Sequence, residues 1–124
     1  MTTLKIGIAN YDQMKERTMA IARGELKARR GDPKVWFTSI ESVAKVLSDR
    51  NRALLELIAE SKPDSLTELA ELSGRRKPNL SRTLKTMANY GLVRLQKGKR
   101  GQIAPRVAYT DIVLDLPIYT KLPA

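Results

Sequence analysis

The side chains best equipped for chemistry in this sequence are cations and amides, and they lie close together along the chain. Ten lysines and arginines occur between residues 72 and 110, where there is no aspartate or glutamate. The whole chain has 23 basic and 13 acidic residues, so the rest of it is neutral and the net charge of +10 comes from this segment. Cations confined in this way are typical of a surface that binds a polyanion.

The spacing inside this segment indicates which polyanion. On a helix over residues 78–89, Leu80, Leu84 and Met87 share one face, and Asn79 and Arg82 lie on the other. In the major groove of DNA, arginine can form two hydrogen bonds to guanine and asparagine two to adenine, so we predict that both contact bases. The predicted phosphate contacts of this region are Arg76, Lys77 and Lys85. The alternative is a solvated helix face that binds nothing.

Cysteine and histidine are both absent. Their absence excludes disulfides, metal sites built on thiolates or imidazoles, cysteine nucleophiles and catalytic triads with a histidine base. The run Gly98-Lys99-Arg100-Gly101 is too short for a Walker phosphate loop, and the acidic residues show no paired arrangement. We therefore expect a protein that is not an enzyme and that uses no cofactor or metal.

The elements that must position the cations follow from capping residues and glycines. Ser65-Leu66-Thr67-Glu68 has the pattern of a capping box, which predicts a helix that ends at Gly74. A second helix follows, with Pro78 in its first turn and Gly91 at its end. Two short helices joined by a glycine-containing turn predict a helix-turn-helix, whose second helix enters the major groove.

Beyond Gly91 the apolar period changes from helical to alternating. Residues 92–95 predict a strand, residues 97–101 a basic loop and residues 106–114 the returning strand, with Pro105 at the edge of this hairpin or just outside it. The loop suits a phosphate backbone or a minor groove, and the alternative is a loop kept polar for solubility. With the hairpin as a wing, the predicted DNA-binding residues are Arg76, Lys77, Pro78, Asn79, Ser81, Arg82, Lys85, Thr86, Lys97, Lys99, Arg100 and Arg106.

The first third of the chain is long for such a unit. Alternation at residues 4–8 predicts a strand, a helix is expected from Asn10 to about Arg29, and Val35-Trp36-Phe37 is expected to be extended. We predict an α+β fold, mainly α with a small β-hairpin. It divides into an N-terminal strand-helix extension (1–48), a winged helix-turn-helix (49–116) and a tail (117–124).

Three runs carry a resemblance to a known family: Leu69-Ala70-Glu71-Leu72-Ser73-Gly74, Leu80-Ser81-Arg82-Thr83-Leu84-Lys85 and Tyr90-Gly91-Leu92-Val93. They resemble the helix-turn-helix core of the ArsR/MarR-like winged-helix regulators, over residues 66–114. The resemblance implies a homodimer that binds a partly palindromic operator in double-stranded DNA and represses its own transcription. The chain departs from the family in two ways. It lacks the Cys and His ligands of the metal-sensing members, and Arg76 stands where the recognition helix of many relatives begins with Ser or Thr.

A second resemblance is narrower. The stretch Lys97-Gly98-Lys99-Arg100-Gly101, with Pro105-Arg106-Val107-Ala108-Tyr109, resembles a group of small regulators that often serve as the antitoxin of a neighbouring toxin. It implies an alternative function, an antitoxin that neutralises a protein toxin and represses its own operon. RNA binding is a third alternative. It is disfavoured because the basic segment offers only two aromatic residues, Tyr90 and Tyr109, and packing explains both.

Residues 36–47 leave two structural alternatives open. Thr38 and Glu41 have capping-box spacing, and the helix that follows carries an apolar stripe. The apolar set forms either a dimer interface or the core of the domain, or it grips a toxin; it comprises Trp36, Phe37, Ile40, Val43 and Leu47. No apolar run approaches the ~18–20 residues of a membrane span, and no secretory pattern opens the sequence, so we expect a cytoplasmic protein without a membrane partner.

Overall fold

The computed structural model describes residues 2–26 and 31–118 and has an α+β fold, as the sequence predicts. Its helices are α1 (Tyr11–Ala22), α2 (Ile40–Val46), α3 (Asp49–Ser61), α4 (Leu66–Ser73) and α5 (Lys77–Asn89), with a 3₁₀ turn, η1 (Lys99–Gly101). Its strands are β1 (Thr3–Ile8), β2 (Val35–Phe37), β3 (Val93–Lys97), β4 (Ile103–Val107) and β5 (Asp111–Asp115). None of the described helices has the length and apolar character needed to cross a membrane.

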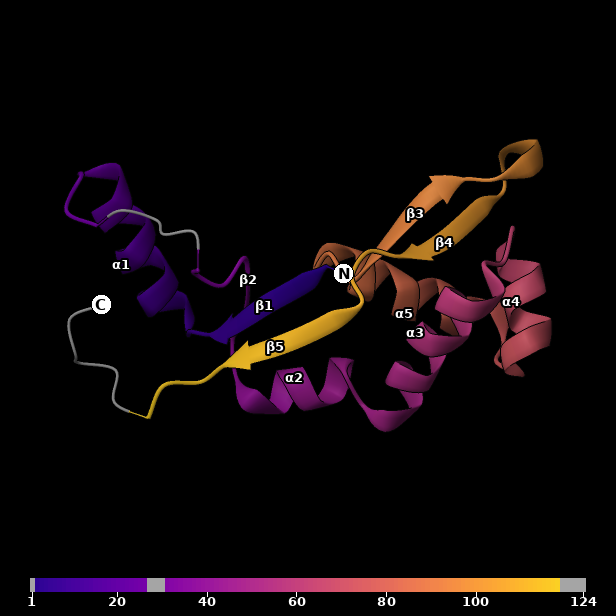
Figure 1. Cartoon of the computed structure of the whole chain (residues 1–124), viewed down its shortest axis with the longest axis horizontal. Helices are drawn as coiled ribbons and strands as arrows, with labels where there is room; N and C mark the ends of the chain where they lie inside the picture. Colours follow the sequence, from indigo (N-terminus) through magenta and orange to yellow (C-terminus); the bar gives the residue numbers. More distant parts are fainter. Residues whose placement is uncertain (1, 27–30, 119–124) are drawn as a thin grey trace.

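The elements are arranged along one long axis (Figure 1). Helix α1 lies at one end, a small sheet lies in the middle, and α3, α4 and α5 lie at the other end with the β3–β4 hairpin. The cationic segment of the sequence therefore occupies the end of the molecule that is farthest from α1.

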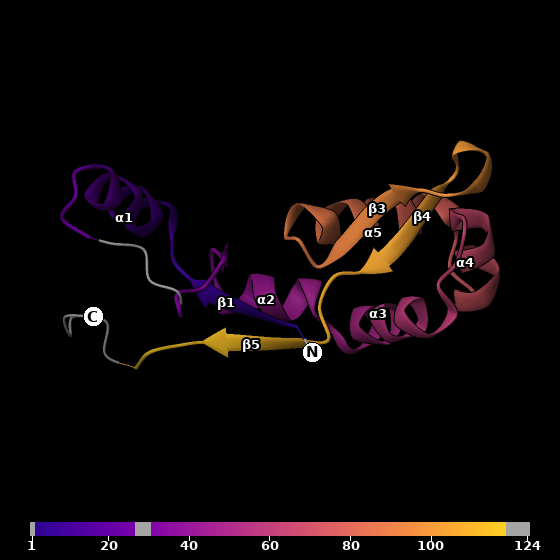
Figure 2. The same cartoon turned by 45° about the horizontal axis from the view of Figure 1, so that its top comes forward.

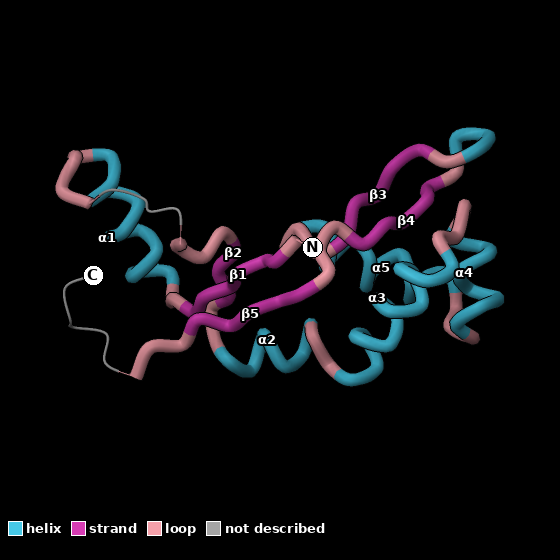
Figure 3. The backbone as a smooth tube through the Cα atoms, viewed as in Figure 1, coloured by secondary structure: helices cyan, strands magenta, loops and turns pink. Residues whose placement is uncertain are grey.

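Three parallel strands form the central sheet, in the order β2-β1-β5. Strand β1 pairs with β2 from Ile6↔Val35 onward and with β5 from Thr3↔Asp111 to Gly7↔Asp115. The first and last strands of the chain thus lie side by side (Figure 3). Gly7 is needed in the middle strand, because a Cβ atom there would lie 2.6 Å from the Trp36 ring.

The structure corrects the prediction of a single returning strand over residues 106–114. Strand β4 ends at Val107 and pairs with β3, whereas β5 leaves the hairpin and joins the central sheet. Pro105 lies inside the paired region, opposite Leu95. The Gly98 N–H donates to the Gln102 carbonyl, so Pro105 falls on a position without ladder hydrogen bonds, where its missing N–H costs nothing. The predicted division at residue 48 does not match the central sheet, which takes strands from both sides of it.

Two predictions for the N-terminal helices were wrong. Helix α1 ends at Ala22 and does not reach Arg29; Gly24 follows with a φ of 78°, which ends the helical conformation, and residues 27–30 lie outside the described part. Helix α2 is capped by Ser39 rather than by Thr38, because the Ser39 hydroxyl accepts a hydrogen bond from the Ser42 N–H at 3.1 Å. The predicted ends of α4 at Ser65 and Gly74 are confirmed, and the Ser48 hydroxyl caps α3.

One hydrophobic core connects the sheet to the helices. The predicted core face of α5 packs there together with Leu4 and Ile6 of β1. The Phe37 ring of β2 stacks on Tyr90, directly after α5, with 4.0 Å between the ring centroids. The end of α5 is therefore fixed against the central sheet.

The five apolar residues between 36 and 47 do not share one environment. Phe37 is 1% exposed and belongs to the interior of the chain. Val43 and Leu47 are partly buried and pack against the core. Trp36 is half-buried, with the Arg17 guanidinium 5.5 Å from its ring. Ile40 is exposed.

Candidate nucleic-acid interface

Helices α4 and α5 are joined by a turn of three residues, 74–76. The Ser65 hydroxyl caps α4 by accepting a hydrogen bond from the Glu68 N–H at 3.0 Å. Gly74 ends α4 with a φ of 72°, in the left-handed region that favours glycine. The chain reverses there, and α4 comes to lie beside α3 and the tip of the hairpin (Figure 2).

Arg75 anchors this turn to the start of α3. Its guanidinium donates to the Asn51 side-chain oxygen at 3.1 Å and to the Arg50 carbonyl oxygen at 2.8 Å. Burial, and next the charge of Arg50, lower the pKa of Arg75 from its ordinary value. Arg75 therefore helps to set the position of α5, although the sequence shows it only as one cation among ten.

The first turn of α5 has no side-chain cap. Its N-cap residue, Arg76, is extended and makes no cap hydrogen bond, and the first turn contains no acidic residue. Pro78 lacks an N–H, but the other N–H groups at the helix start need acceptors, and the helix dipole adds partial positive charge at this end. The start of α5 is thus electrostatically suited to an anion.

Helix α5 has one buried and one exposed face, as predicted. Leu80, Leu84 and Met87 are at most 1% exposed. The seven predicted contact residues on α5 are all exposed; they are Lys77, Pro78, Asn79, Ser81, Arg82, Lys85 and Thr86. At 3.6 residues per turn, Arg82 and Lys85 lie on the line opposite the buried face. The outermost side of α5 therefore carries cationic groups.

The β3–β4 hairpin follows α5 and carries the next cations. Lys97, Lys99 and Arg100 are exposed at its tip, where Arg100 and Gly101 have positive φ angles of 61° and 74°. The tip reaches back to the start of α5, because Lys77 and Gly101 line the same groove of about 240 Å³ with residues 65–67. The structure thus brings Lys77 and the hairpin tip together.

Gly98 and Arg106 hold the hairpin against the α3–α4 connection. A Cβ atom on Gly98 would lie 2.7 Å from the Asp64 carbonyl oxygen, so only glycine allows the two backbones to approach this closely. Arg106 donates to the carbonyl oxygens of Pro63 at 2.6 Å and Pro105 at 2.8 Å, and it lies 3.5 Å from the Asp64 carboxylate. Arg106 therefore differs from the other predicted contacts: its side chain is 21% exposed and is directed to the α3–α4 connection.

Most of the positive charge in the acid-free segment is not neutralised within the fold. Of its ten cations, Arg106 forms an ion pair and Arg75 is bound to α3. The others form no ion pair with any residue that the structure describes; they are Arg76, Lys77, Arg82, Lys85, Arg94, Lys97, Lys99 and Arg100. They lie at the start of α5, on α5, on β3 and at the hairpin tip, and α5 packs against β3.

A second groove, the α2–α5 groove, borders the later turns of α5. Its volume is about 640 Å³, and Arg82, Thr83 and Thr86 line it from α5. Ser42 and Lys45 line it from α2. Neither residue is among the predicted contacts, because Lys45 lies outside the acid-free segment and only the packing of α2 beside α5 brings it here.

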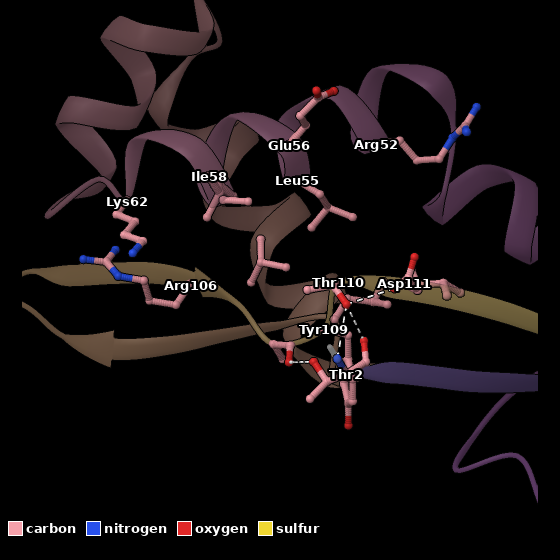
Figure 4. Close-up of a pocket in the computed structure, with 15 residues that line it drawn as sticks. Thr2, Arg52, Leu55, Glu56, Ile58, Lys62, Arg106, Tyr109, Thr110 and Asp111 are labelled. Atoms are coloured by element: carbon pink, nitrogen blue, oxygen red, sulfur yellow. Dashed lines mark hydrogen bonds between the residues drawn. The ribbon is translucent and has the colours of Figure 1, made fainter. Parts of the chain in front are cut away.

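A third hollow, of about 660 Å³, lies between α3 and the connection from β4 to β5 (Figure 4). Leu55 and Ile58 contribute apolar surface, and charged groups of both signs line it, including Lys62 and Glu56. This mixture does not complement a polyanion. Its acidic groups do not form a metal site either, since the described residues contain no group of three or more potential metal ligands.

Comparison with known proteins shows a family for the greater part of the chain. Residues 46–114 match the family model HVO_A0114. The match runs from the end of α2 through α3, α4, α5 and the hairpin into β5, and so includes every predicted DNA-binding residue. No curated protein and no solved structure matches the chain.

Proposed function

The chain belongs to the HVO_A0114 family, and we propose that it is a transcriptional repressor that binds double-stranded DNA through a winged helix-turn-helix. In this proposal α4 and α5 form the helix-turn-helix, α5 is the recognition helix, and the β3–β4 hairpin is the wing. The observation that carries it is the set of eight cations without ion-pair partners in the described residues, gathered on and beside an exposed helix.

The proposed contacts divide into two kinds. Asn79 and Arg82 read base edges in the major groove, because both side chains are exposed on α5 and can form paired hydrogen bonds to bases. The cations at the hairpin tip and at the start of α5 bind phosphates, which orient the protein on the duplex without reading its sequence. The protein has no enzymatic activity in this proposal.

The proposed active form is a homodimer on a partly palindromic operator. Two recognition helices would then contact half-sites about one helical turn apart, ~34–36 Å, or a multiple of that. The region between α1 and β5 is available for the dimer contact, since α1 buries no side chain and exposes Tyr11 and Met19, and β5 has one unpaired edge among the described strands. The same exposed helix favours the second candidate function, an antitoxin that binds a protein toxin there.

Fluorescence anisotropy with the DNA upstream of the gene itself tests the main proposal. Arg82→Ala should reduce the preference for the operator over random duplex by roughly 5- to 150-fold, which corresponds to ~1–3 kcal/mol for one bidentate base contact. Lys99→Ala should weaken binding to all duplexes equally and flatten the salt dependence. Lys15→Ala on α1 is the control, because it removes one exposed charge far from the hairpin. If Arg82→Ala keeps both affinity and preference, the assignment of the recognition face is wrong.

Light scattering and copurification distinguish the two proposed roles of α1, the dimer contact and the binding of a toxin. A Met19→Asp variant that becomes monomeric when purified alone supports the dimer contact at α1. A variant that stays dimeric but no longer copurifies with the product of an adjacent gene supports the antitoxin.

A further inference from the structure

The α2–α5 groove has the chemistry of a phosphate site. Two cations, Lys45 and Arg82, line it together with hydroxyl groups of Ser42, Thr83 and Thr86. No carboxylate occurs among the described residues that line it. Lysine, arginine and hydroxyl side chains are the groups that most often bind the phosphate oxygens of DNA.

Positive charge extends from this groove toward the start of α3. Asn51 lines the groove and accepts a hydrogen bond from Arg75, which in turn donates to the Arg50 carbonyl oxygen. Arg50 has no ion pair within the described part of the chain. Asp49, the acidic residue beside it, is paired with Arg52. Like charges that are held close without carboxylates between them favour an external anion.

A helix in the major groove of DNA has a phosphate backbone on each side of it, because the groove is only about 12 Å wide. The hairpin tip, with Lys97, Lys99 and Arg100, can bind the backbone beside the start of α5, where Lys77 and the tip share a groove. The later turns of α5 border α2 instead. We therefore expect α2, which lies outside the helix-turn-helix and the wing, to contact the second phosphate backbone.

We propose that the α2–α5 groove binds the second phosphate backbone of the DNA duplex, with Lys45 of α2 as its contact and Arg82 between this backbone and the bases. The Ser42 hydroxyl is not a contact, because it already donates its proton to the Ser39 carbonyl oxygen at 2.7 Å. This inference rests on the proposed DNA-binding function and extends it to a helix that precedes the helix-turn-helix. In this proposal α2 is part of the DNA-binding surface, and the protein contacts phosphates on both sides of α5.

The experiment compares Lys45→Gln with Lys99→Gln, and uses Lys15→Gln as the matched control. All three variants remove one exposed lysine charge, from α2, the hairpin tip and α1 respectively. Anisotropy titrations at several salt concentrations give the slope of log affinity against log salt, and ethylation interference identifies the phosphates that each variant contacts. Thermal melting verifies that every variant is folded.

The Lys45→Gln and Lys99→Gln variants should each reduce the slope by about 0.9 per protomer, the contribution of one phosphate contact, and Lys15→Gln should leave it unchanged. Lys45→Gln should also abolish interference at phosphates on the side of the major groove opposite to those lost with Lys99→Gln. If Lys45→Gln binds with the wild-type slope and interference pattern while Lys99→Gln does not, the α2 contact is refuted and the proposed function stands. If the wild-type chain binds no duplex at any salt concentration, the proposed function itself fails.

Discussion

Arg106 and Lys99 lie on the same hairpin, yet the structure gives them different surroundings. Arg106 donates a charged hydrogen bond of 2.6 Å to the Pro63 carbonyl oxygen and pairs with the half-exposed Asp64 carboxylate. A hydrogen bond to a charged group contributes about 1.5–3 kcal/mol, and an exposed ion pair adds only about 0.5 kcal/mol. Arg106→Met keeps the aliphatic stem and loses both interactions, so the free energy of unfolding should fall by about 2–3 kcal/mol. For a chain of this length, that lowers Tm by roughly 10 °C.

Lys99→Met should have the reverse effects. Lys99 is exposed at the tip and forms no ion pair in the described residues, so Tm should stay within about 2 °C of the wild-type value. If Lys99 binds a phosphate as proposed, the substitution reduces the salt slope by about 0.9 per protomer, or about 1.8 for the proposed homodimer. Raising the salt from about 50 to 200 mM should then weaken binding by the variant about 12-fold less than it weakens binding by the wild type.

Calorimetry and salt-dependent anisotropy on the same two variants test this separation. Arg106→Met should melt early but keep the wild-type salt slope, even where its affinity is reduced by a loosened hairpin. A wild-type Tm together with a flattened slope for Arg106→Met would refute the structural role of Arg106 and restore it to the DNA-binding set.

The remaining predictions concern stability, measured by urea or thermal denaturation. Gly98→Ala should cost about 1–3 kcal/mol, because its Cβ would collide with the Asp64 carbonyl oxygen at 2.7 Å, whereas Gly31→Ala, with nothing within 4 Å, should be nearly neutral; equal effects would contradict the close backbone approach. Lys62→Gly should stabilise the protein by about 0.5–1 kcal/mol, because Lys62 ends α3 with a φ of 45°; a loss of stability would mean that its side chain contributes more than the backbone strain removes. Phe37→Ala should cost about 3–5 kcal/mol through the lost burial and the lost stack on Tyr90, and a cost below about 1 kcal/mol would show that β2 does not hold the end of α5.

The α4–turn–α5 unit could be predicted because its determinants are local. Ser65 lies three residues before its capping partner, Gly74 directly follows α4, and the apolar residues of α5 repeat with the helical period. None of these features depends on a distant part of the chain. The same reasoning failed at Thr38, because two possible caps, Thr38 and Ser39, are adjacent and only the packed structure selects Ser39.

The central sheet could not be predicted in this way. The prediction places residues 106–114 in one strand that returns from the hairpin, because the pattern of the sequence does not say which strand each part will pair with, and the nearest strand along the chain is β3. In the structure β5 pairs with β1, at the other end of the sequence, and Thr2 and Thr110 hydrogen-bond where the two strands begin. A contact between residues so far apart leaves no pattern in either segment.

The sequence by itself determined the helix boundaries around Gly74 and the confinement of excess charge to one segment, since both follow from residue type and spacing. Only the tertiary structure decided which of those charges are available to a ligand. It directs Arg75 and Arg106 to backbone oxygens of distant elements, leaves Arg82 and Lys99 exposed, and brings Lys45 beside α5. The reason is physical: an ionised side chain has the same charge wherever it lies, but its partners are set by the packing of elements that the sequence keeps apart.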